Sequence, residues 1–356
     1  MQIKLKNKST RARALKCLNW VELYVNKTRA ISKIELFDQF GNTSRQPGKA
    51  LKELLLEVAD PYYNMNTGSC IKYRRNRKGI EWVKSQLGIT EFTPTLTPEQ
   101  DRQLDTGEIE YKDKSQRLWC DFQYIKKTIR NPLLKSKGYN WDYDIEVAAP
   151  TLLYQLSQRC YQQQWLLDNQ TRKLRRPPIL TLSYIEQYIN DRSGLRTEIA
   201  NDCLVAESDV KITITALFQG GCLTTYRDSK LFQDLGCDHR KVRALSENQF
   251  LRGLRRDIKK MWIPLRDQMP VRYQTDKNGI SKRVAVRGKD KSGVYLGIER
   301  EVADVIRGYL KKTHNRHLWI HDGWCCSKRI YSDELVSEVR RKTGYLIRLS
   351  EKVIEN

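Results

Sequence analysis

The stretch Trp319-Ile320-His321-Asp322-Gly323-Trp324, followed by Cys325-Cys326, decides the fold of this chain. Apolar residues lead into an Asp-Gly dipeptide and a second apolar run leads out, which predicts a β-hairpin with a tight two-residue turn. This hairpin would carry one carboxylate, that of Asp322, at its tip. Such turns are common, so a plain turn residue is the alternative interpretation of Asp322.

The segments on either side of the hairpin predict the rest of a small sheet domain. Glu299 to Lys311 and Asp333 to Arg341 have helical spacing, and Gly344 is placed to end the second helix. Tyr345 to Leu349 is then predicted as a closing strand. Helices alternating with antiparallel strands predict an α+β fold for this part of the chain.

Length and charge restrict the functions that the chain can have. Its 356 residues suffice for two or three domains, and its formal net charge is +23. An excess this large indicates a polyanionic partner, most often nucleic acid, although a merely solvated basic surface is the alternative. The sequence has no apolar run of transmembrane length and no signal-peptide core, so we expect no membrane partner and a cytoplasmic location. Nine cysteines without a C-x-x-C pair indicate reduced thiols rather than a zinc site.

The first ninety residues contain 18 Lys and Arg against 7 Asp and Glu, nearly half of the net charge. Helices are predicted over Leu15–Val25, Ile31–Phe40 and Pro47–Val58, followed by a basic hairpin that turns at Asn66-Thr67-Gly68. This order is typical of a winged helix-turn-helix domain, here residues 1–92; a small helical domain for protein contacts is the alternative. The predicted DNA contacts are Arg45, Lys49 and Lys52 on the third helix and Lys72, Arg74, Arg75, Arg77 and Lys78 on the wing.

Two prolines within residues 93–98 predict a linker over 93–110, which leaves 111–356 as a second domain. Within it, Phe250 to Trp262 predicts an amphipathic helix whose apolar face carries Phe250, Leu254, Ile258 and Met261. Its opposite face is a basic stripe suited to a template backbone, made of Arg252, Arg255, Arg256 and Lys259; a solvated charged face is the alternative. Lys282 to Lys291 is predicted as a basic loop.

Two more segments carry residues suited to nucleotide chemistry. Asp142 to Leu153 begins as a strand and turns into an apolar helix around Pro150, which leaves Asp144 at the strand end. Lys211 to Gly221 predicts a helix that starts with a lysine and ends at a glycine pair. These segments and the hairpin, in this order, resemble three motifs of the family A-like DNA polymerases found in transposons and small viruses. The stretch from Arg117 to Leu134 also looks similar, so the resemblance covers about residues 111–356.

The resemblance implies a polymerase palm with helical fingers and assigns roles to several residues. Asp144 and Asp322 would hold Mg²⁺ or Mn²⁺, and Lys211 would bind the incoming dNTP or NTP and protonate the leaving group. Gly220 and Gly221 would let a base pair approach the backbone, and His321, which matches the family's His-Asp pair, would lie at the nucleotide site. Simply holding the hairpin or the primer end is the alternative for His321. The implied function is that of a small plasmid or phage replication protein, which binds an origin duplex and copies a single-stranded DNA template.

The sequence departs from the cellular family A pattern at four positions. Gly323 replaces the Glu after the His-Asp pair, Glu207 replaces an Arg before the fingers lysine, and Gln219 replaces a Tyr. In the register of Asp144, Ala149 stands where a bulky Glu excludes ribose. We therefore expect tolerance of ribonucleotides and synthesis that starts without a primer, as in a primase.

Two other functions stay open from the sequence. A rolling-circle initiator with a tyrosine nickase would need two histidines that reach one metal ion. His317 and His321 are four residues apart, roughly 13 Å along a strand, which is too far to share an ion. A non-catalytic origin-binding protein, in which only the winged domain acts, is the second alternative.

Overall fold

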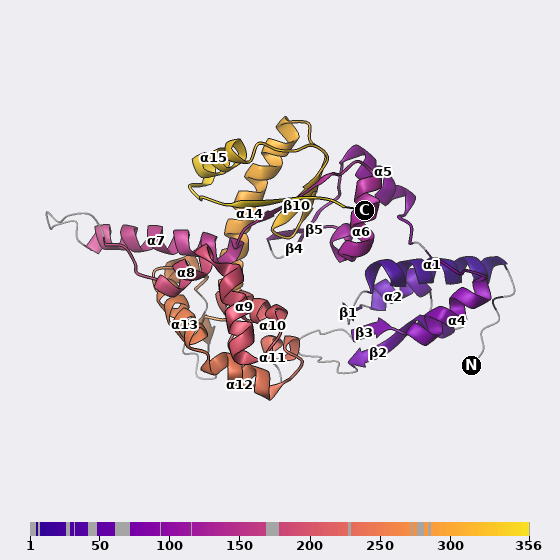
Figure 1. Cartoon of the computed structure of the whole chain (residues 1–356), viewed down its shortest axis with the longest axis horizontal. Coiled ribbons are helices and arrows are strands. Elements are labelled where there is room, and N and C mark those ends of the chain that lie inside the picture. The colour runs from indigo at the N-terminus through magenta and orange to yellow at the C-terminus, as the bar shows by residue number, and fades with distance from the viewer. Residues whose placement is uncertain are drawn as a thin grey trace.

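The computed structural model describes residues 5, 8–25, 29–31, 33–41, 48–60, 72–92, 94–114, 116–168, 178–226, 229–271, 273–275, 281–283 and 286–355. Figure 1 shows an N-terminal group of helices with a small sheet, a second sheet flanked by helices, and a group of helices below that sheet. Antiparallel sheets combined with many helices confirm the predicted α+β class. Among the described helices, none is long and apolar enough to cross a membrane.

The N-terminal part has its own apolar core, formed by side chains such as those of Leu18, Phe40, Leu51 and Leu55. Its strands form a three-stranded sheet in the order β1-β3-β2. Its elements are α1 (Lys8–Tyr24), β1 (Arg29–Ala30), α2 (Lys33–Phe40), α3 (Gly48–Leu55), β2 (Leu56–Asp60), β3 (Lys72–Arg75) and α4 (Arg77–Leu87).

Two predictions for this part were wrong. The third helix ends at Leu55 and not at Val58, because the chain passes directly into β2, which pairs with β3. Arg77 and Lys78 lie in the first turn of α4 instead of on a wing, since the Asn76 side chain accepts a hydrogen bond from the Gly79 N–H and starts a helix there. The predicted turn at 66–68 and Arg45 lie outside the described residues.

The stretch predicted as a linker contains helix α5 (Pro98–Thr106). Thr97 and Gln100 form a capping box at its start, which satisfies two backbone donors that a helix start otherwise leaves unpaired. Leu104 is fully buried, and its carbonyl accepts a hydrogen bond from the Tyr139 hydroxyl. The predicted linker therefore contains a helix that packs on the following domain through Leu104, which two prolines alone did not indicate.

The second sheet has four antiparallel strands in the order β11-β6-β10-β9. These are β6 (Trp141–Ile145), β9 (His317–Ile320), β10 (Gly323–Cys326) and β11 (Leu349–Val353); the predicted closing strand at 345–349 is thus displaced toward the C-terminus. Tyr143, Trp324 and Trp319 stack in a row across three strands, with ring centroids 5.5 and 5.4 Å apart. This face packs on α14 (Gly288–Lys312) and α15 (Ser332–Thr343), and Leu318 and Cys325 pack the opposite face near α6 (Lys127–Ser136).

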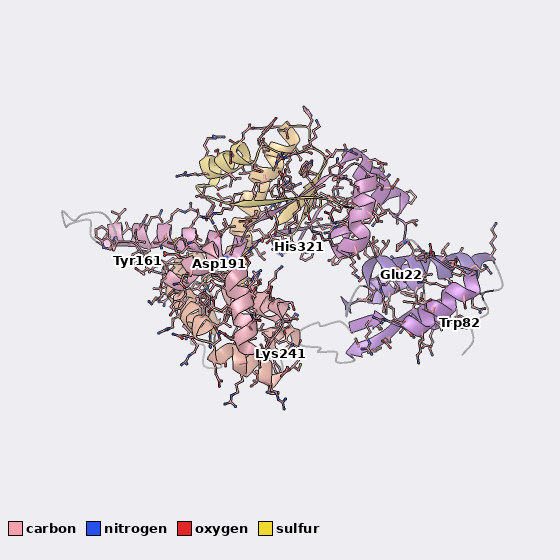
Figure 2. The ribbon with its side chains drawn as sticks, in the orientation of Figure 1. Glu22, Trp82, Tyr161, Asp191, Lys241 and His321 are labelled. Atoms are coloured by element: carbon pink, nitrogen blue, oxygen red, sulfur yellow. The ribbon has the colours of Figure 1, made fainter. Side chains whose placement is uncertain are left out.

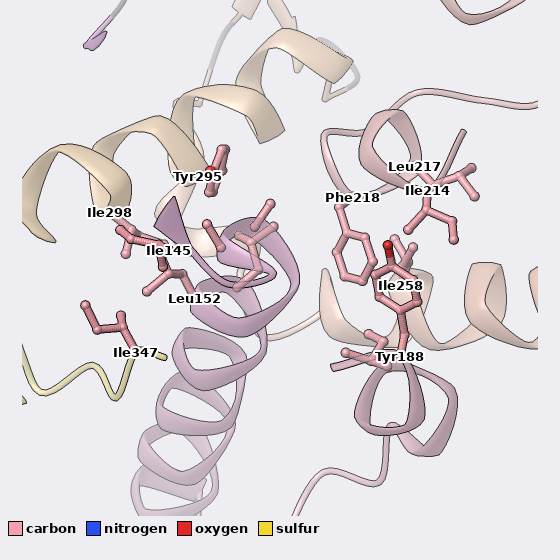
Figure 3. Packing of buried hydrophobic residues seen from close by; sticks show 14 of the residues in the cluster. Ile145, Leu152, Tyr188, Ile214, Leu217, Phe218, Ile258, Tyr295, Ile298 and Ile347 are labelled. Atoms are coloured by element: carbon pink, nitrogen blue, oxygen red, sulfur yellow. The ribbon is translucent and has the colours of Figure 1, made fainter. Parts of the chain in front are cut away.

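The helices between β6 and α14 form the group below the sheet (Figure 1). They are α7 (Ala148–Asp168), α8 (Ser183–Asn190), α9 (Arg192–Cys203), α10 (Glu207–Phe218), α11 (Lys230–Asp234), α12 (His239–Glu247) and α13 (Gln249–Met261). Figure 3 shows Tyr188, Phe218 and Ile258 of this group packed together, and the same core continues to Ile145 and Leu152 beside the sheet. The apolar face predicted for α13 is confirmed, since Leu254, Ile258 and Met261 are buried.

Short elements complete the chain. They are β4 (Lys112–Lys114), β5 (Arg117–Trp119), the 3₁₀ turns η1 (Asp121–Tyr124) and η2 (Arg266–Gln268), β7 (Tyr273–Thr275) and β8 (Ser281–Arg283). The prediction of a loop over 282–291 was wrong. Its first residues belong to β8 and its last to the first turn of α14, where the Asp290 side chain accepts a hydrogen bond from the Arg287 N–H.

Candidate active site

The tip of the β9–β10 hairpin differs by one residue from the predicted turn. Ile320 pairs with Gly323, so the two turn residues are His321 and Asp322. His321 has φ +57°, a conformation that costs energy for a residue with a side chain. Gly323 is the first residue of β10, and a Cβ atom there would lie 2.4 Å from the Tyr143 carbonyl oxygen. This contact leaves no room for a side chain at position 323.

Pairing of β10 with β6 places Asp144 and Asp322 side by side. Gly323 is the partner of Asp144, and the Ile145 N–H donates a hydrogen bond of 3.1 Å to the Asp322 carbonyl. Asp144 is exposed as a whole residue, although many protein atoms surround its carboxyl group, and Asp322 is half-buried. Desolvation by the surrounding protein, and then the charge of Asp322, raise the pKa of Asp144 to about 6. The two predicted metal ligands are therefore close enough to repel each other.

Two cations lie near this pair of carboxylates. Arg192 and Lys211 both act to lower the pKa of Asp144, Arg192 more strongly, although desolvation outweighs them. Lys211 is exposed on α10, and Arg192 is the first residue of α9, where Asp191 caps the helix by accepting a hydrogen bond from the Gly194 N–H. Figure 2 labels Asp191 and His321 on the adjoining parts of the molecule that contain these groups. Nothing in the local sequence of Arg192 pointed to a site, because its role depends on tertiary placement alone.

A buried ion pair supports the hairpin. The Arg117 guanidinium donates two hydrogen bonds, of 2.7 and 2.5 Å, to the Glu299 carboxylate, which is 4% exposed. Burial opposes the charge on Arg117, but Glu299, helped by Tyr295 and Asp322, raises the pKa of this group above its usual value. Arg117 thus stands between α14 and the hairpin tip. The sequence marked it only through the resemblance upstream of Asp142.

His321 is held on the aromatic ring of Trp119. The two rings meet edge to face with centroids 5.8 Å apart, and Trp119 stacks on Tyr124 at 6.0 Å. Burial, and then the charge of Arg117, lower the pKa of His321, so the imidazole is neutral at pH 7. Within the described part of the chain, its Nδ1 atom is buried without a hydrogen-bond partner. His321 therefore has a donor or acceptor available beside Asp322.

The end of α10 confirms that the glycine pair closes this helix. Gly220 has φ +84°, and the Gly221 N–H donates to the Ala216 carbonyl. A Cβ atom at Gly220 would lie 2.8 Å from the Lys291 side chain, so this turn is in close contact with the start of α14. Ala149 lies in the first turn of α7 and is 8% exposed. That turn follows Asp144 directly, although the helix starts at Ala148, before the predicted Pro150.

The predicted DNA-contacting residues fall into three groups. Lys49, Arg77, Lys78, Arg252, Arg256 and Lys259 are exposed, Arg255 is half-buried, and the Lys52 ammonium lies over the Tyr73 ring. Arg74 forms an ion pair with Glu57, and Arg75 donates to Glu22 and to the Val25 carbonyl, which ties β3 to the end of α1. Arg75 is thus engaged inside the domain instead of facing outward. Arg45 and the side chain of Lys72 lie outside the described residues.

The site offers two carboxylates rather than a larger ligand cluster. Over the described ranges, no group of three or more His, Cys, Asp or Glu side chains could hold a metal ion. Asp142 is not available as a third metal ligand, because its carboxylate forms an ion pair of 2.6 Å with Lys127. His317, the partner of His321 in the rolling-circle alternative, is 6% exposed, and its Nδ1 contacts the Asn315 carbonyl at 3.1 Å. It lies at the opposite end of β9, which disfavours a two-histidine metal site.

Comparisons with known proteins identify no relative of this chain. No protein-family model matches the chain, and a comparison with curated proteins gives no match. The site is accordingly interpreted from its own residues: two adjacent carboxylates on paired strands, two cations nearby, and a neutral histidine at the hairpin tip.

Proposed function

We propose that this protein is a replication enzyme that joins nucleotides on a DNA template by metal-assisted nucleotidyl transfer. The observation that carries the proposal is the pair Asp144 and Asp322, which strand pairing brings together where the two central strands of the sheet, β6 and β10, meet the hairpin turn. Two negative charges on neighbouring strands destabilise each other unless a cation lies between them. Structural ion pairs, which are common elsewhere in this protein, would be a simpler use of either carboxylate.

The residues fit a pair of Mg²⁺ or Mn²⁺ ions. Mg²⁺ at nucleotide-transfer sites takes one or two protein carboxylates and completes its shell with phosphate oxygens and water, so Asp144 and Asp322 would suffice. When bound, such ions lower the pKa of the attacking hydroxyl and neutralise charge on the reacting phosphate. Asp144, with its raised pKa, binds a divalent ion better as the pH rises above about 6.

The surrounding side chains have roles that follow from their charge and position. Arg192 and Lys211 would attract the triphosphate of the nucleotide to the side of the carboxylates where α9 and α10 begin. The exposed Lys211 ammonium can give a proton to the oxygen that leaves with pyrophosphate. Arg117, held by Glu299, keeps the hairpin and therefore Asp322 in position.

The N-terminal part would bring this site to DNA. We propose that α1, α2 and α3 with the sheet β1-β3-β2 are a winged helix-turn-helix, in which the exposed Lys49 on α3 faces the duplex. The exposed basic residues of α13 would contact the backbone of the single-stranded template. Binding at a replication origin and synthesis there would then reside in one chain.

The choice of sugar gives one test of the site. If Ala149 lies at the ribose gate, the wild-type protein incorporates NTPs, and Ala149→Glu lowers the efficiency ratio of NTPs to dNTPs about tenfold or more, because a bulky side chain excludes the 2′-hydroxyl. Steady-state incorporation of both nucleotide types by the same variant provides the ratio, so a general loss of folding cancels. Ala148→Glu, one residue away, is the control for register. An equal decrease of the NTP to dNTP efficiency ratio in both variants would contradict a ribose gate at position 149.

Arg192, which the sequence did not indicate as a site residue, gives a second test. Arg192→Met is expected to raise the KM for the nucleotide about tenfold with a smaller effect on kcat, since a charged hydrogen bond to phosphate contributes about 1.5–3 kcal/mol. Arg243→Met, which removes an exposed arginine on α12, should leave the KM unchanged. Equal KM values in wild type and Arg192→Met would remove Arg192 from the nucleotide site.

Incorporation of labelled nucleotides decides the proposal as a whole. Purified protein is supplied with a single-stranded DNA template, NTPs or dNTPs, and Mg²⁺, with and without a primer. We expect template-dependent products that EDTA abolishes. Duplex binding without any incorporation would instead support a non-catalytic origin-binding protein, and a covalent adduct between DNA and a tyrosine would support the nickase alternative.

A further inference from the structure

A cavity of about 600 Å³ lies between the N-terminal helices and the catalytic hairpin. Trp20 and Tyr24 of α1 and Gln39 of α2 line one side, α5 contributes its first turns, and β5 and η1 contribute Trp119 and Tyr124. The volume falls in the range that holds a small planar ligand. Among the described residues, neither the carboxylate pair nor any of the predicted DNA-binding residues lines it.

The cavity presents an aromatic surface next to the catalytic hairpin. Trp119 and Tyr124 stack with an interplanar angle of 19°, and Tyr124 is 37% exposed, so part of its ring faces solvent. Trp119 in turn contacts His321, which precedes Asp322. The aromatic pair therefore contacts the turn that carries the second carboxylate.

The charges in the cavity are unlike those of the whole chain. Among the described residues that line it, five are acidic (Glu35, Asp38, Glu99, Glu110 and Asp121) and one is a cation, Lys112, although the protein has a net charge of +23. Glu99 is paired with Arg102. A negative lining repels phosphate groups and favours ligands that donate hydrogen bonds to carboxylates.

We propose that this cavity binds one unpaired nucleobase of a single DNA strand, stacked on Tyr124 and Trp119, while its phosphates remain outside. The base would carry an exocyclic amino group, because carboxylates accept hydrogen bonds from such groups and thymine has none. Cytosine, adenine and guanine therefore fit better than thymine, whose one donor, N3–H, lies between two carbonyl oxygens that a carboxylate repels. The inference deepens the proposed function by giving the strand beside the hairpin an anchoring point, but binding itself needs neither metal nor nucleotide.

Short oligonucleotides test the proposal on the full-length protein. Affinities for hexamers of dC and dT are measured by fluorescence anisotropy in EDTA, which separates binding from synthesis. We expect dC to bind several-fold more tightly than dT, and Tyr124→Leu to weaken dC binding about tenfold, as the loss of one base–aromatic stack implies. Tyr124→Phe should retain the affinity, and Tyr331→Leu, an 80% exposed tyrosine elsewhere, is the matched control.

Two further readouts distinguish stacking from a structural effect. The fluorescence of a hexamer with one 2-aminopurine should be quenched on binding to wild type and not on binding to Tyr124→Leu. The double variant Asp121→Asn with Glu110→Gln should show a smaller difference in affinity between the dC and dT hexamers. Equal affinities of wild type and Tyr124→Leu, or equal affinities for dC and dT, would overturn the proposal. Asp322→Asn should bind dC normally, so a failure of synthesis leaves this result independent.

Discussion

Asparagine in place of Asp144 or Asp322 is expected to lower nucleotide incorporation by on the order of 10³-fold, with little change in DNA affinity. A metal ion at such a site stabilises the transition state by several kcal/mol, and each 1.4 kcal/mol corresponds to a tenfold change in rate. Asparagine keeps the size of the side chain but removes the charge that, under the proposed function, would bind the ion. Single-turnover incorporation with excess enzyme measures the effect on chemistry alone.

Asp142→Asn is the matched control, because Asp142 lies on the same strand two residues before Asp144 and is paired with Lys127. We expect incorporation close to the wild-type rate. If Asp142→Asn were as inactive as Asp144→Asn, a general requirement for negative charge on β6 would replace the specific pair. Activity that survives in Asp322→Asn would exclude the proposed mechanism.

The same Asp144→Asn variant should be more stable than the wild type when no metal is present. A carboxyl group whose pKa is raised in the folded state binds its proton more tightly there, so the folded state loses stability as the pH rises from the ordinary carboxyl range through about 6. Asparagine does not ionise and avoids this loss. Thermal unfolding in EDTA should therefore give a higher Tm for the variant at pH 8 and converging values near pH 4. A difference that does not vary with pH would contradict the raised pKa.

Gly323→Ala is expected to destabilise the protein by about 1–3 kcal/mol and to reduce incorporation as strongly as loss of a carboxylate. The added methyl group would lie 2.4 Å from the Tyr143 carbonyl, so β10 must move away from β6. Asp144 is the strand partner of Gly323, and Asp322 directly precedes Gly323. This movement therefore separates the two carboxylates. Unfolding in urea and incorporation assays measure the two effects.

Gly308→Ala provides a control of opposite sign. Gly308 lies inside α14, and no atom outside its own helix lies within 4 Å of where its Cβ would be. Alanine there should stabilise the protein by about 0.5–1 kcal/mol and leave incorporation unchanged. An equal loss of stability in both variants would mean that the contact with Tyr143 is not the cause.

The sequence predicted the parts of the site that depend on local patterns. Apolar runs on either side of the Asp322-Gly323 dipeptide predicted the hairpin, and the glycine pair at Gly220 predicted the end of α10, because turn and helix-end geometry involve neighbours in the chain. The turn was displaced by one residue, since Gly323 is required by its contact with Tyr143 across the sheet. No local signal reports a contact of that kind.

Other features depended on tertiary placement and were missed for that reason. Arg192 and the pair of Arg117 with Glu299 become site residues only when distant segments meet. Arg75 lies in a basic stretch typical of a wing, yet its guanidinium donates hydrogen bonds to the Glu22 carboxylate and the Val25 carbonyl. Charge alone does not distinguish an arginine that faces DNA from one that joins two elements of its own domain.

The order of elements also determines when each part of the fold can form during synthesis of the chain. Asp144 and Asp322 are 178 positions apart, and helices α7 to α14 all lie between them, so the pair exists only after residue 326 has left the ribosome and β10 has joined β6. The N-terminal core, completed by residue 92, can fold much earlier. If the proposed function is correct, a nascent chain could hold DNA before it can extend a strand.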